Sequence, residues 1–401
     1  MRETTLALVL AGGKGERLYP LTAERTKPSV PFGGKYRIID FALSNLVNSG
    51  IYSIYVLVQY KSQSLIEHIR TTWRKAGVLP RHFITVVPPQ MRREGIKEWY
   101  RGTADSVYQN INLIYDFKPK MVAIFSADHI YRMNIKQMID FHLRKKAHLT
   151  ISTVPVTYQE AEKFGIVTFD SNFRVKSFKE KPHIKRKMKV FASMGNYIFD
   201  ADVLVEVLEK VSEKTTTHDF GRDIVPSLIE KKAKVYAYDF SQNKIPSIKK
   251  YEDSFYWQDV GTIESYWQAN MDLLGEKPLL DLRNPSWPIY ASNFNIPPAY
   301  IGDSSINNSL VGEGCRIYGA EVSNSILGRG VVIKRGCNIK NSIIMDFTII
   351  KKNCRIKKTI IDRYNVIKEK SLIGYCLQRD KKKYFVDSSD IIVIKRGERR
   401  F

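Results

Sequence analysis

The sequence predicts an α/β protein with a mostly parallel sheet first and a parallel β-helix after it. Residues 1–277 alternate short apolar runs with segments of helical periodicity, and residues 299–401 repeat an aliphatic residue about every six positions. The length of 401 residues is too great for one average core, so two domains are expected. The fold class is therefore a Rossmann-like domain followed by a left-handed β-helix.

The first domain is predicted from fully apolar strands. Leu6–Ala11, Ile54–Val58 and Met121–Phe125 are strand-length apolar runs, and Ser62–Arg74 and Thr103–Tyr115 have apolar residues at helical spacing. Strands that are apolar on both faces indicate a parallel sheet covered by helices on each side. In such sheets ligands bind beyond the carboxyl ends of the strands.

A proline-rich, irregular stretch separates the two predicted domains. It contains Asn-Pro and Pro-Pro pairs between Lys277 and Pro298, which are typical of a linker. We therefore expect a catalytic domain over 1–277, a linker over 278–298, and a hexapeptide-repeat domain with a C-terminal regulatory tail over 299–401.

The repeat in the second domain has three short strands per coil, with groups that start 16 or 17 residues apart. The aliphatic positions are Val311, Ile317, Leu327, Ile333, Ile339, Ile344, Ile350, Ile356, Ile361, Ile367 and Ile373. A six-residue period with one inward aliphatic side chain per strand is typical of a hexapeptide parallel β-helix. Cys315, Cys337 and Cys354 each stand two residues before a core isoleucine, so we expect buried, reduced thiols, with Cys337 and Cys354 in neighbouring coils.

The net charge of +23 allows three interpretations. One is a nucleic-acid-binding protein, a second is an enzyme with phosphorylated ligands, and a third is a lysine-rich surface. The basic clusters are scattered and contain no nucleic-acid-binding motif, which argues against the first. The sequence has no signal peptide and no apolar run long enough to span a membrane, so a cytoplasmic protein is expected.

A glycine-rich loop follows the first predicted strand. Gly12, Gly13 and Gly15 would let backbone N–H groups approach phosphates, and Lys14 and Arg17 add positive charge. A glycine-rich turn of this kind is weak evidence alone.

Further segments resemble the signature of sugar-nucleotide pyrophosphorylases, specifically the bacterial glucose-1-phosphate adenylyltransferase branch that makes ADP-glucose. The resemblance lies in family order and spacing over nearly the whole chain. Its segments are Leu10–Leu18, Thr26–Lys35, Arg37–Asn45, Trp99–Asp105, Ala127–Tyr131, Phe164–Ile166, Lys179–Pro182, Ala192–Asn196, His218–Gly221 and Tyr256–Thr262.

The resemblance implies transfer of the adenylyl group of ATP to glucose 1-phosphate, with pyrophosphate leaving, as the committed step of glycogen synthesis. Such a transfer depends on positioning and charge neutralisation. Asp128, at the end of an apolar strand, and Asp259 would bind Mg²⁺, and Arg17 and Lys27 would neutralise charge on the pyrophosphate side. The histidines have no expected role.

The resemblance also implies two sets of binding residues. The nucleotide would meet the glycine-rich loop and, beyond it, Gln59, Gln90, Gly102 and Thr103. Glucose 1-phosphate would meet Tyr100, Gly165, Glu180, Lys181 and Ser193, with Lys181 on its phosphate and Glu180 on the sugar hydroxyls.

The chain departs from the family pattern at three positions. Glu16 puts an anion in the phosphate loop, Ala127 replaces a glycine before the metal-binding aspartate, and Glu24 replaces a lysine of relatives activated by fructose 1,6-bisphosphate. An anionic metabolite effector is still expected, bound by Arg25 and Arg37 with Lys382 and Lys383 of the tail. The relatives are homotetramers, so we expect one here, with or without a paralogous subunit.

Three other functions stay open. The first is a nucleotidyltransferase using UTP or dTTP, or a bifunctional enzyme acetylating sugars in its β-helix, although residues 301–401 contain no histidine. The second is a catalytically weak regulatory subunit, against which the retained Asp128, Lys181 and Asp259 argue. The third is a nucleic-acid-binding module, which only the charge supports.

Overall fold

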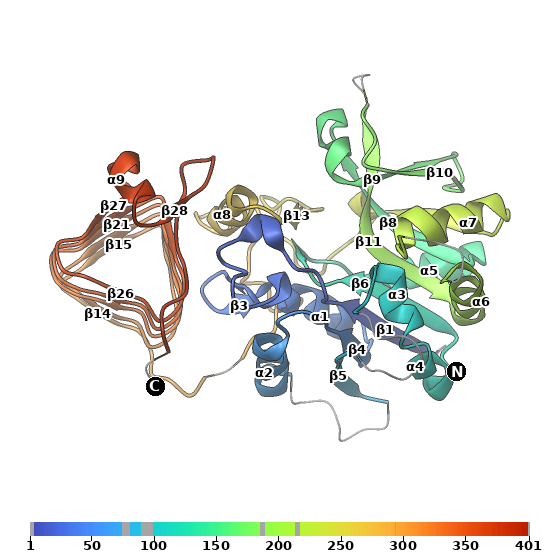
Figure 1. Ribbon diagram of the computed structural model, residues 1–401, viewed down its shortest axis with the longest axis horizontal. Coiled ribbons are helices and arrows are strands. Elements are labelled where there is room, and N and C mark those ends of the chain that lie inside the picture. The colour runs from blue at the N-terminus through green and yellow to red at the C-terminus, as the bar shows by residue number, and fades with distance from the viewer. Residues whose placement is uncertain are drawn as a thin grey trace.

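A computed structural model describes residues 4–73, 81–89, 99–184, 189–212, 217–292 and 294–399. It contains a nine-stranded sheet domain and a triangular β-helix, which lie side by side (Figure 1). The expected fold class is confirmed. In the described part of the chain, no helix has both the length and the apolar character needed to cross a bilayer.

The centre of the large sheet is parallel. Its strands run in the order β5, β4, β1, β6, and beyond β6 the antiparallel strand β11 joins it to β8, β12 and the hairpin β9–β10. The bounds are β1 Thr5–Leu10, β4 Ser53–Leu57, β5 Phe83–Val87, β6 Met121–Ser126, β8 Leu149–Val156, β9 Gly165–Phe169, β10 Val175–Glu180, β11 Val190–Asp200 and β12 Val235–Asp239. The carboxyl ends of β1, β4 and β6 therefore meet at one edge.

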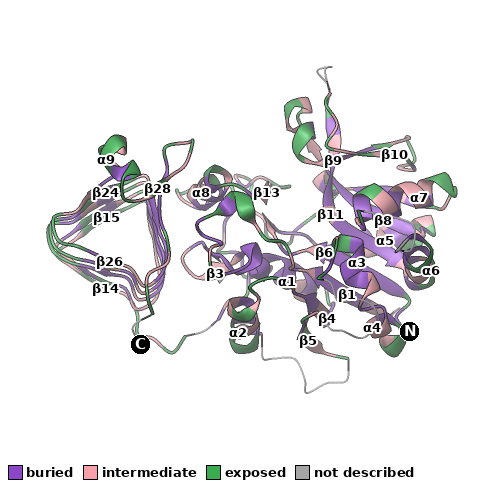
Figure 2. Ribbon diagram, in the orientation of Figure 1, coloured by how far each residue is buried: buried purple, intermediate pink, exposed green. Residues whose placement is uncertain are grey.

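Helices cover both faces of this sheet because its strands are apolar on both sides. Along β1, Ala7 and Val9 pack into one core and Leu6 and Leu8 into the other. The first core takes α1 Ile38–Asn48, α2 Gln63–Thr72 and α5 Ile135–Lys145; the second takes α3 Thr103–Tyr108, α4 Asn112–Phe117, α6 Ala201–Ser212 and α7 Val225–Glu230. The sheet is the most continuously buried part of this domain (Figure 2).

The segment Thr103–Tyr115, which has apolar residues at helical spacing, forms two helices, α3 and α4, with a turn between them. Between them lies the buried Asn110, whose side-chain amide donates to Ser106 O and Tyr100 Oη, each at 2.9 Å. These local bonds compete with a continuous helical ladder.

The second domain is a β-helix with three parallel faces. The first face is β14 Tyr300–Gly302, β17 Arg316–Tyr318, β20 Val332–Ile333, β23 Ile349–Ile350 and β26 Val366–Ile367. The second is β15 Ser305–Asn307, β18 Glu321–Ser323, β21 Asn338–Lys340, β24 Arg355–Lys357 and β27 Leu372–Ile373. The third is β16 Leu310–Val311, β19 Ile326–Leu327, β22 Ile343–Ile344, β25 Thr359–Ile361 and β29 Ile392–Ile394, with β28 Phe385–Val386 antiparallel at its edge.

The predicted aliphatic ladder fills the interior of this β-helix. Cys315, Cys337 and Cys354 are buried free thiols, as expected, and each donates to a backbone carbonyl at 3.0 Å. Asn338 N donates to Cys354 O at 2.8 Å, so Cys337 and Cys354 lie in neighbouring coils. The short helix α9 Leu377–Lys381 leaves the helical path before β28 and β29 complete the last coil.

The third face of the β-helix packs on the first domain. Ile326, Ile343 and Ile360 point outward and join a core that contains Phe32 and Tyr266 of the sheet domain. Tyr266 belongs to α8 Ile263–Met271, which follows the two-stranded sheet of β7 His129–Tyr131 and β13 Trp257–Asp259. The domain contact is therefore a hydrophobic core of its own.

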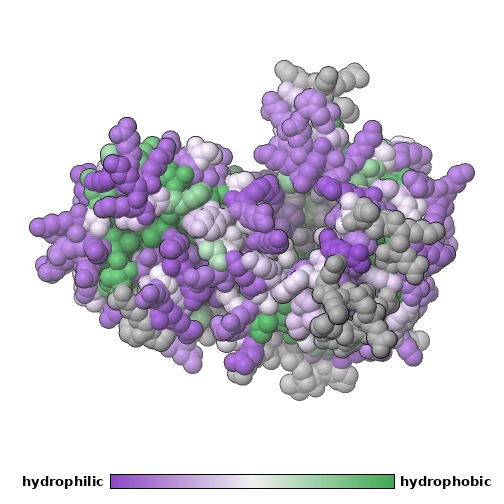
Figure 3. Space-filling model, in the orientation of Figure 1, coloured by the Kyte–Doolittle hydropathy of each residue, from purple (hydrophilic) through white to green (hydrophobic). Residues whose placement is uncertain are grey.

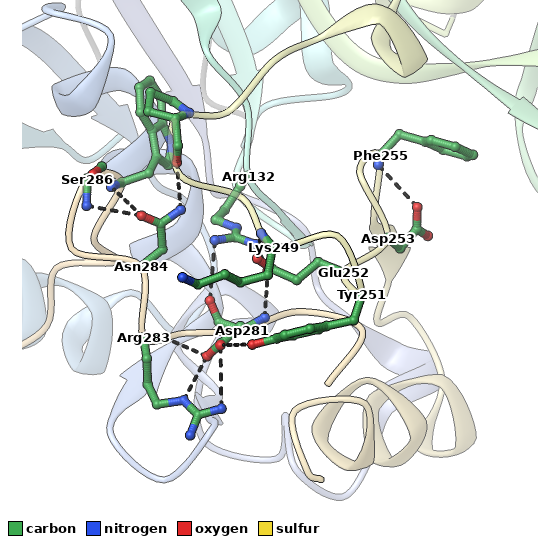
Figure 4. A network of polar contacts seen from close by, with 12 residues as sticks. Arg132, Lys249, Tyr251, Glu252, Asp253, Phe255, Asp281, Arg283, Asn284 and Ser286 are labelled. Carbon is green, nitrogen blue, oxygen red and sulfur yellow. Dashed lines mark hydrogen bonds and ion pairs between the residues drawn. The ribbon is translucent and has the colours of Figure 1, made fainter. Parts of the chain in front are cut away.

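The proline-rich segment is irregular but packed. Trp287 is 5 % exposed, and its indole N–H donates to Asn45 of α1 at 3.3 Å. The buried Glu252 pairs with Arg132, which follows β7, and accepts from Asp281 N at 2.9 Å (Figure 4). The segment is thus fastened to the strand that follows Asp128.

Candidate active site

A large cavity opens over the carboxyl ends of β1, β4 and β6. Its volume is about 1300 Å³, and its wall brings together thirteen of the predicted site residues: Gly12, Gly13, Gly15, Arg17, Lys27, Gln59, Tyr100, Gly102, Thr103, Asp128, Gly165, Glu180 and Ser193. Figure 3 shows a hollow near the middle of the molecule, rimmed mostly by hydrophilic side chains. Segments far apart in sequence therefore meet at the edge where an α/β sheet binds ligands.

The glycine-rich loop forms one wall of the cavity. Gly15 has φ 65°, and a Cβ there would lie 3.0 Å from the Cβ of Lys27, so the position requires glycine. Gly13 has open space where a Cβ would stand. Glu16 also lines the cavity, and Lys14 lies 3.9 Å from its carboxylate and balances its charge, with both side chains largely exposed.

A second wall carries Gln59 and the turn before α3. The side-chain amide of Gln59 donates to Tyr100 O at 3.2 Å, and the Thr103 hydroxyl donates to Asp219 at 2.8 Å. A Cβ on Gly102 would lie 2.3 Å from His218 O, because the backbone of 217–218 crosses directly over it. Gln90, the other predicted adenine contact, lies outside the described residues.

The two predicted metal ligands converge on one lysine. Lys27 Nζ lies 3.0 Å from Asp128 Oδ2 and 2.7 Å from Asp259 Oδ1, and its side chain is 8 % exposed. Asp128 follows β6 and Asp259 ends β13, which pairs with β7 so that Asp259 lies opposite His129. The carboxylates thus come from elements more than a hundred residues apart.

Electrostatics hold this cluster in its charged form. Burial lowers the pKa of Lys27, but the carboxylates of Asp128 and Asp259 outweigh burial, and the pKa is raised above its ordinary value. Burial acts to raise the pKa of Asp128, but Lys27, His129 and the Ser126 hydroxyl together lower it far below the usual range. Arg17 also lies 3.9 Å from Asp259, so the two carboxylates are balanced by one buried ammonium and one exposed guanidinium.

Sequence reasoning gave no role to His129, which adjoins this cluster. One ligand atom from each of Asp128, His129 and Asp259 lies within 4.8 Å of the others, an arrangement that could hold a metal ion. His129 Nδ1 is buried, makes no hydrogen bond within the described chain, and lies 3.4 Å from Asp128 Oδ1. The sequence signal that could have indicated this position is that His129 directly follows the predicted metal ligand Asp128.

The far end of the cavity is acidic and aromatic. Glu180 lines it beside Ser193, and burial, followed by the nearby Asp219, raises the pKa of Glu180. Asp219 and Tyr197 also line the cavity, and sequence reasoning named neither as a single site residue. Lys181 does not join this wall, because its backbone has φ 47° and its side chain is exposed.

The family models and curated relatives agree with this geometry. Residues 6–276 match the nucleotidyl transferase model, and residues 300–394 match the model of the GlmU-like C-terminal hexapeptide. A glucose-1-phosphate adenylyltransferase of Thermodesulfovibrio yellowstonii is 51 % identical over 98 % of this chain and 96 % of its own. Glucose-1-phosphate adenylyltransferase 1 of Vibrio cholerae is 48 % identical over 98 % of both chains, and the Thermus thermophilus enzyme is 47 % identical over 81 % and 82 %.

The chain belongs to the glucose-1-phosphate adenylyltransferase family. It is a nucleotidyltransferase by this membership, and the nucleotidyl transferase model covers the sheet domain that holds the cavity.

The predicted effector residues lie apart from the cavity of this family member. Arg25 was expected to be available to a ligand, but it is 1 % exposed and paired with Asp362 of the β-helix. Its position between two packed domains, which the sequence does not reveal, is the reason. Arg37 donates to Ser64 O at 3.0 Å, and burial, with the nearby Arg363 and Arg25, lowers its pKa to about 9.

Four arginines of the domain interface, Arg25, Arg37, Arg329 and Arg363, lie in one electrostatic cluster. In the described chain, Nε of Arg25, Arg329 and Arg363 is buried without a hydrogen-bond partner. Lys382 and Lys383 are exposed beyond α9, and no described contact joins either to Arg25 or Arg37. Glu24 is exposed and lies 3.1 Å from Arg396 of the tail.

Proposed function

We propose that the protein converts ATP and α-D-glucose 1-phosphate into ADP-glucose and pyrophosphate. The observation that carries the proposal is the cavity in which Lys27 and Asp128, with Asp259 paired to Lys27, lie between a glycine-rich loop and an acidic far end. A phosphate oxygen of glucose 1-phosphate attacks the α-phosphorus of ATP, and the bond to pyrophosphate breaks. The attacking oxygen is already ionised, so the reaction needs no protein nucleophile.

Charge neutralisation is the main task of the residues at the bottom of the cavity. Lys27 and Arg17 stabilise the charge that grows on the leaving pyrophosphate. Asp128 and Asp259 would hold Mg²⁺, which binds through one or two carboxylates together with phosphate oxygens and water. Imidazole nitrogen suits other metals better, so we assign the ion to the two carboxylates and not to His129. When bound, Mg²⁺ neutralises and orients the phosphates.

The two substrates take opposite ends of the cavity in this proposal. The nucleotide phosphates lie on Gly12, Gly13 and Gly15, with the adenine toward Gln59, Gln90 and the Gly102–Thr103 turn. Glucose 1-phosphate lies at the far end with Tyr100, Gly165 and Ser193, where Glu180 accepts from sugar hydroxyls. Lys181 is exposed next to Glu180, so it would reach the sugar phosphate only by turning inward.

We also propose regulation by an anionic metabolite, with a place in glycogen synthesis. The supporting observation is the arginine cluster between the domains, in which three guanidinium groups keep an unpartnered buried nitrogen. An anion there would contact both domains at once and so favour one packing over another. Arg25 and Arg37, which the sequence predicts as effector residues, belong to this cluster, and Lys382 and Lys383 of the tail would have to approach it from α9.

A homotetramer, alone or with a paralogous subunit, is the proposed assembly. Apolar side chains are exposed on the β-helix, including Tyr300 at 57 % and Ile301 at 47 %. Figure 3 shows hydrophobic surface on this domain. Exposed apolar surface of this kind marks protein contacts. Sedimentation should give about four times the 46.3 kDa chain mass, and a monomer at micromolar concentration would contradict the assembly. We expect the protein in the cytoplasm, where both substrates occur.

The test of the reaction is pyrophosphate release from the purified protein with each of the four NTPs and glucose 1-phosphate. ATP should be preferred, with release dependent on Mg²⁺ and abolished by EDTA. Release with UTP or dTTP alone would assign another nucleotidyltransferase. No release with any NTP would assign the regulatory-subunit alternative.

A further inference from the structure

A second cavity, separate from the catalytic one, lies between α5, β12 and the turn of the β9–β10 hairpin. Its volume is about 300 Å³, and none of the residues that line it lines the catalytic cavity. That volume is at the low end for small-molecule sites, which suits a ligand of one or two sugar rings.

Aromatic side chains form one side of this second cavity. Phe141 of α5 packs edge-on against Phe173, with ring centroids 6.2 Å apart, and against Tyr238 of β12 at 5.6 Å. Phe141 and Phe173 are only half-buried, and both line the cavity. An aromatic face with its negative quadrupole attracts the C–H face of a sugar ring.

The backbone at Phe173 supports a specific role for that ring. Phe173 has φ 64°, a conformation that bulky residues rarely adopt. The turn is nonetheless fixed, because Phe173 N donates to Asp170 O and Ala237 N donates to Phe173 O, each at 2.9 Å. Glycine or asparagine would fit this turn without the same penalty. The ring of Phe173 stacks on Phe169 at 5.5 Å between ring centroids and meets Phe141 with its edge, so this conformation fixes the ring beside the cavity.

Polar groups stand on the rim of the same cavity. Arg144 is exposed and makes no ion pair with any described residue. Asp239 uses Oδ1 for Ser241 N at 3.0 Å and Ser241 Oγ at 2.7 Å, while its Oδ2 makes no described hydrogen bond. The Tyr238 hydroxyl accepts from Asn243 at 2.9 Å and still has its own proton to donate. The rim thus offers donors and acceptors to a polyhydroxylated ligand.

The charges that line this cavity give a phosphorylated ligand little net attraction. Asp140 also lines the cavity, but Lys136 lies 2.6 Å from it and balances it. Among the other lining residues the formal charges of Arg144 and Asp239 cancel, and the Lys145 ammonium, which is not a lining group, lies 5.9 Å from the Phe141 ring centroid. The catalytic cavity, by contrast, has Lys14, Arg17 and Lys27 for phosphates.

We propose that this cavity, which we call the aromatic pocket, binds a neutral hexose ring, either free or within an α-glucan chain. The proposal does not depend on the catalytic reaction. Aromatic faces supply apolar contact with the ring, and Arg144, Asp239 and Tyr238 hydrogen-bond its hydroxyls. No covalent step is involved.

The experiment is saturation-transfer NMR on the full-length protein with glucose, maltose and maltotriose, and affinity electrophoresis in gels containing glycogen. Wild type should bind with millimolar dissociation constants. Phe173→Asn removes the ring and tolerates the positive φ, and should weaken binding roughly 2- to 12-fold, the range expected for one aromatic contact. Arg144→Gln replaces an exposed side chain, so the fold should be kept, and saccharide binding should weaken by a similar factor. Tyr52→Asn is the matched control, because Tyr52 is exposed and stacks on His82 outside the pocket.

The outcomes separate the sources of the ligand. Equal affinity for glucose and maltotriose assigns a single ring, and affinity that rises with length assigns a glucan chain; both support the proposal. Binding that neither variant weakens, no binding at all, or tighter binding of glucose 6-phosphate than of glucose would overturn it. Pyrophosphate release by both variants should stay within about twofold of wild type. If the wild type releases none, the proposed reaction fails while the saccharide result still stands.

Discussion

Lys27 is the buried cation between the carboxylates of Asp128 and Asp259, and Arg17 approaches Asp259 from the exposed side. Lys27, His129 and the Ser126 hydroxyl hold the pKa of Asp128 well below its usual range, so its carboxylate is ionised at neutral pH. A permanently ionised carboxylate beside a buried ammonium is suited to bind a cation and unsuited to exchange protons. The single-residue evidence therefore favours phosphoryl-type transfer over acid–base catalysis.

We expect Asp128→Asn to reduce turnover by at least about 10²-fold while the protein stays folded. The change is nearly isosteric, but it removes the charge that would hold Mg²⁺, a loss of several kcal/mol in the transition state. Pyrophosphate release measures the effect, and circular dichroism checks the fold. Asp116→Asn, an exposed carboxylate on α4, should leave turnover unchanged. Full activity in the Asp128 variant would remove that residue from the mechanism.

Glu180→Gln should stabilise the protein and weaken sugar-phosphate binding at the same time. The folded state raises the pKa of Glu180, so the unfolded chain loses that proton first as pH rises above about 4.3. Wild-type stability therefore falls through this window and stays reduced at neutral pH. The Gln variant should have a higher melting temperature than wild type at pH 7 and the same melting temperature near pH 4. Its KM for glucose 1-phosphate should be raised roughly 10- to 150-fold, because a hydrogen bond to a charged group is lost.

Glu206→Gln is the control for the stability measurement. The Lys210 ammonium lowers the pKa of Glu206 on α6, so its loss should not raise the melting temperature at pH 7. If Glu180→Gln raises the melting temperature as much at pH 4 as at pH 7, the packing of the amide, and not the loss of a charge, is responsible.

At the scale of elements, the cavity depends on two segments that are far apart in the sequence but cross each other in space. The turn before α3 passes under residues 217–218, and Ala104 N donates to His218 O at 2.9 Å. Thr103 ties the same turn to Asp219. The proposed nucleotide and sugar ends of the cavity are thereby joined through backbone, and the crossing leaves no room for a side chain at Gly102.

We expect Gly102→Ala to destabilise the protein by about 1–3 kcal/mol, the usual cost of overpacking. Its new Cβ would lie 2.3 Å from His218 O, and backbone cannot move aside as a flexible side chain can. Denaturant unfolding measures the change. Gly13→Ala is matched, since it adds the same methyl group into open space, and should change stability by less than about 0.5 kcal/mol. Equal effects at the two positions would show that the crossing is not rigid.

At the scale of the whole molecule, the hydrophobic contact between the domains places an arginine cluster where both domains meet. Arg25 and Arg37 come from the sheet domain, and Arg329 and Arg363 come from the β-helix. Because Asp362 pairs with Arg25 across this contact, charge added or removed there affects how the domains pack. The C-terminal tail adds a second ion pair between the two domains, because Arg396 pairs with Glu24 of the sheet domain.

Fructose 1,6-bisphosphate should activate weakly, and Glu24→Lys should lower its half-activating concentration roughly tenfold or more. A glutamate at position 24 repels a nearby phosphate, whereas a lysine there attracts it. Each of these interactions is worth about 1 kcal/mol at 4 Å in water and more in a cleft. An activity titration of both proteins measures the shift, with Glu230→Lys on α7 as a charge-matched control. Strong activation of the wild type at micromolar effector would show that Arg396 already cancels Glu24, or that Glu24 lies outside the site.

The sequence by itself determined the parts of this protein that depend on local pattern. Alternation of apolar and helical segments fixed the sheet domain, and the six-residue ladder fixed the β-helix, because burial of a periodic apolar face allows few other solutions. The glycine-rich loop and Asp128 could also be placed in advance, since both follow strands whose carboxyl ends form the ligand edge. These features are encoded within single elements.

Only the tertiary structure decided what depends on elements meeting in space. It buried Arg25 against Asp362, set Lys27 between Asp128 and Asp259, and left Lys181 exposed. It also joined Phe141, Phe173 and Tyr238 from three separate elements into the aromatic pocket. The physical reason is that burial and pairing of a charge depend on neighbours distant in the chain, which periodicity and spacing do not record.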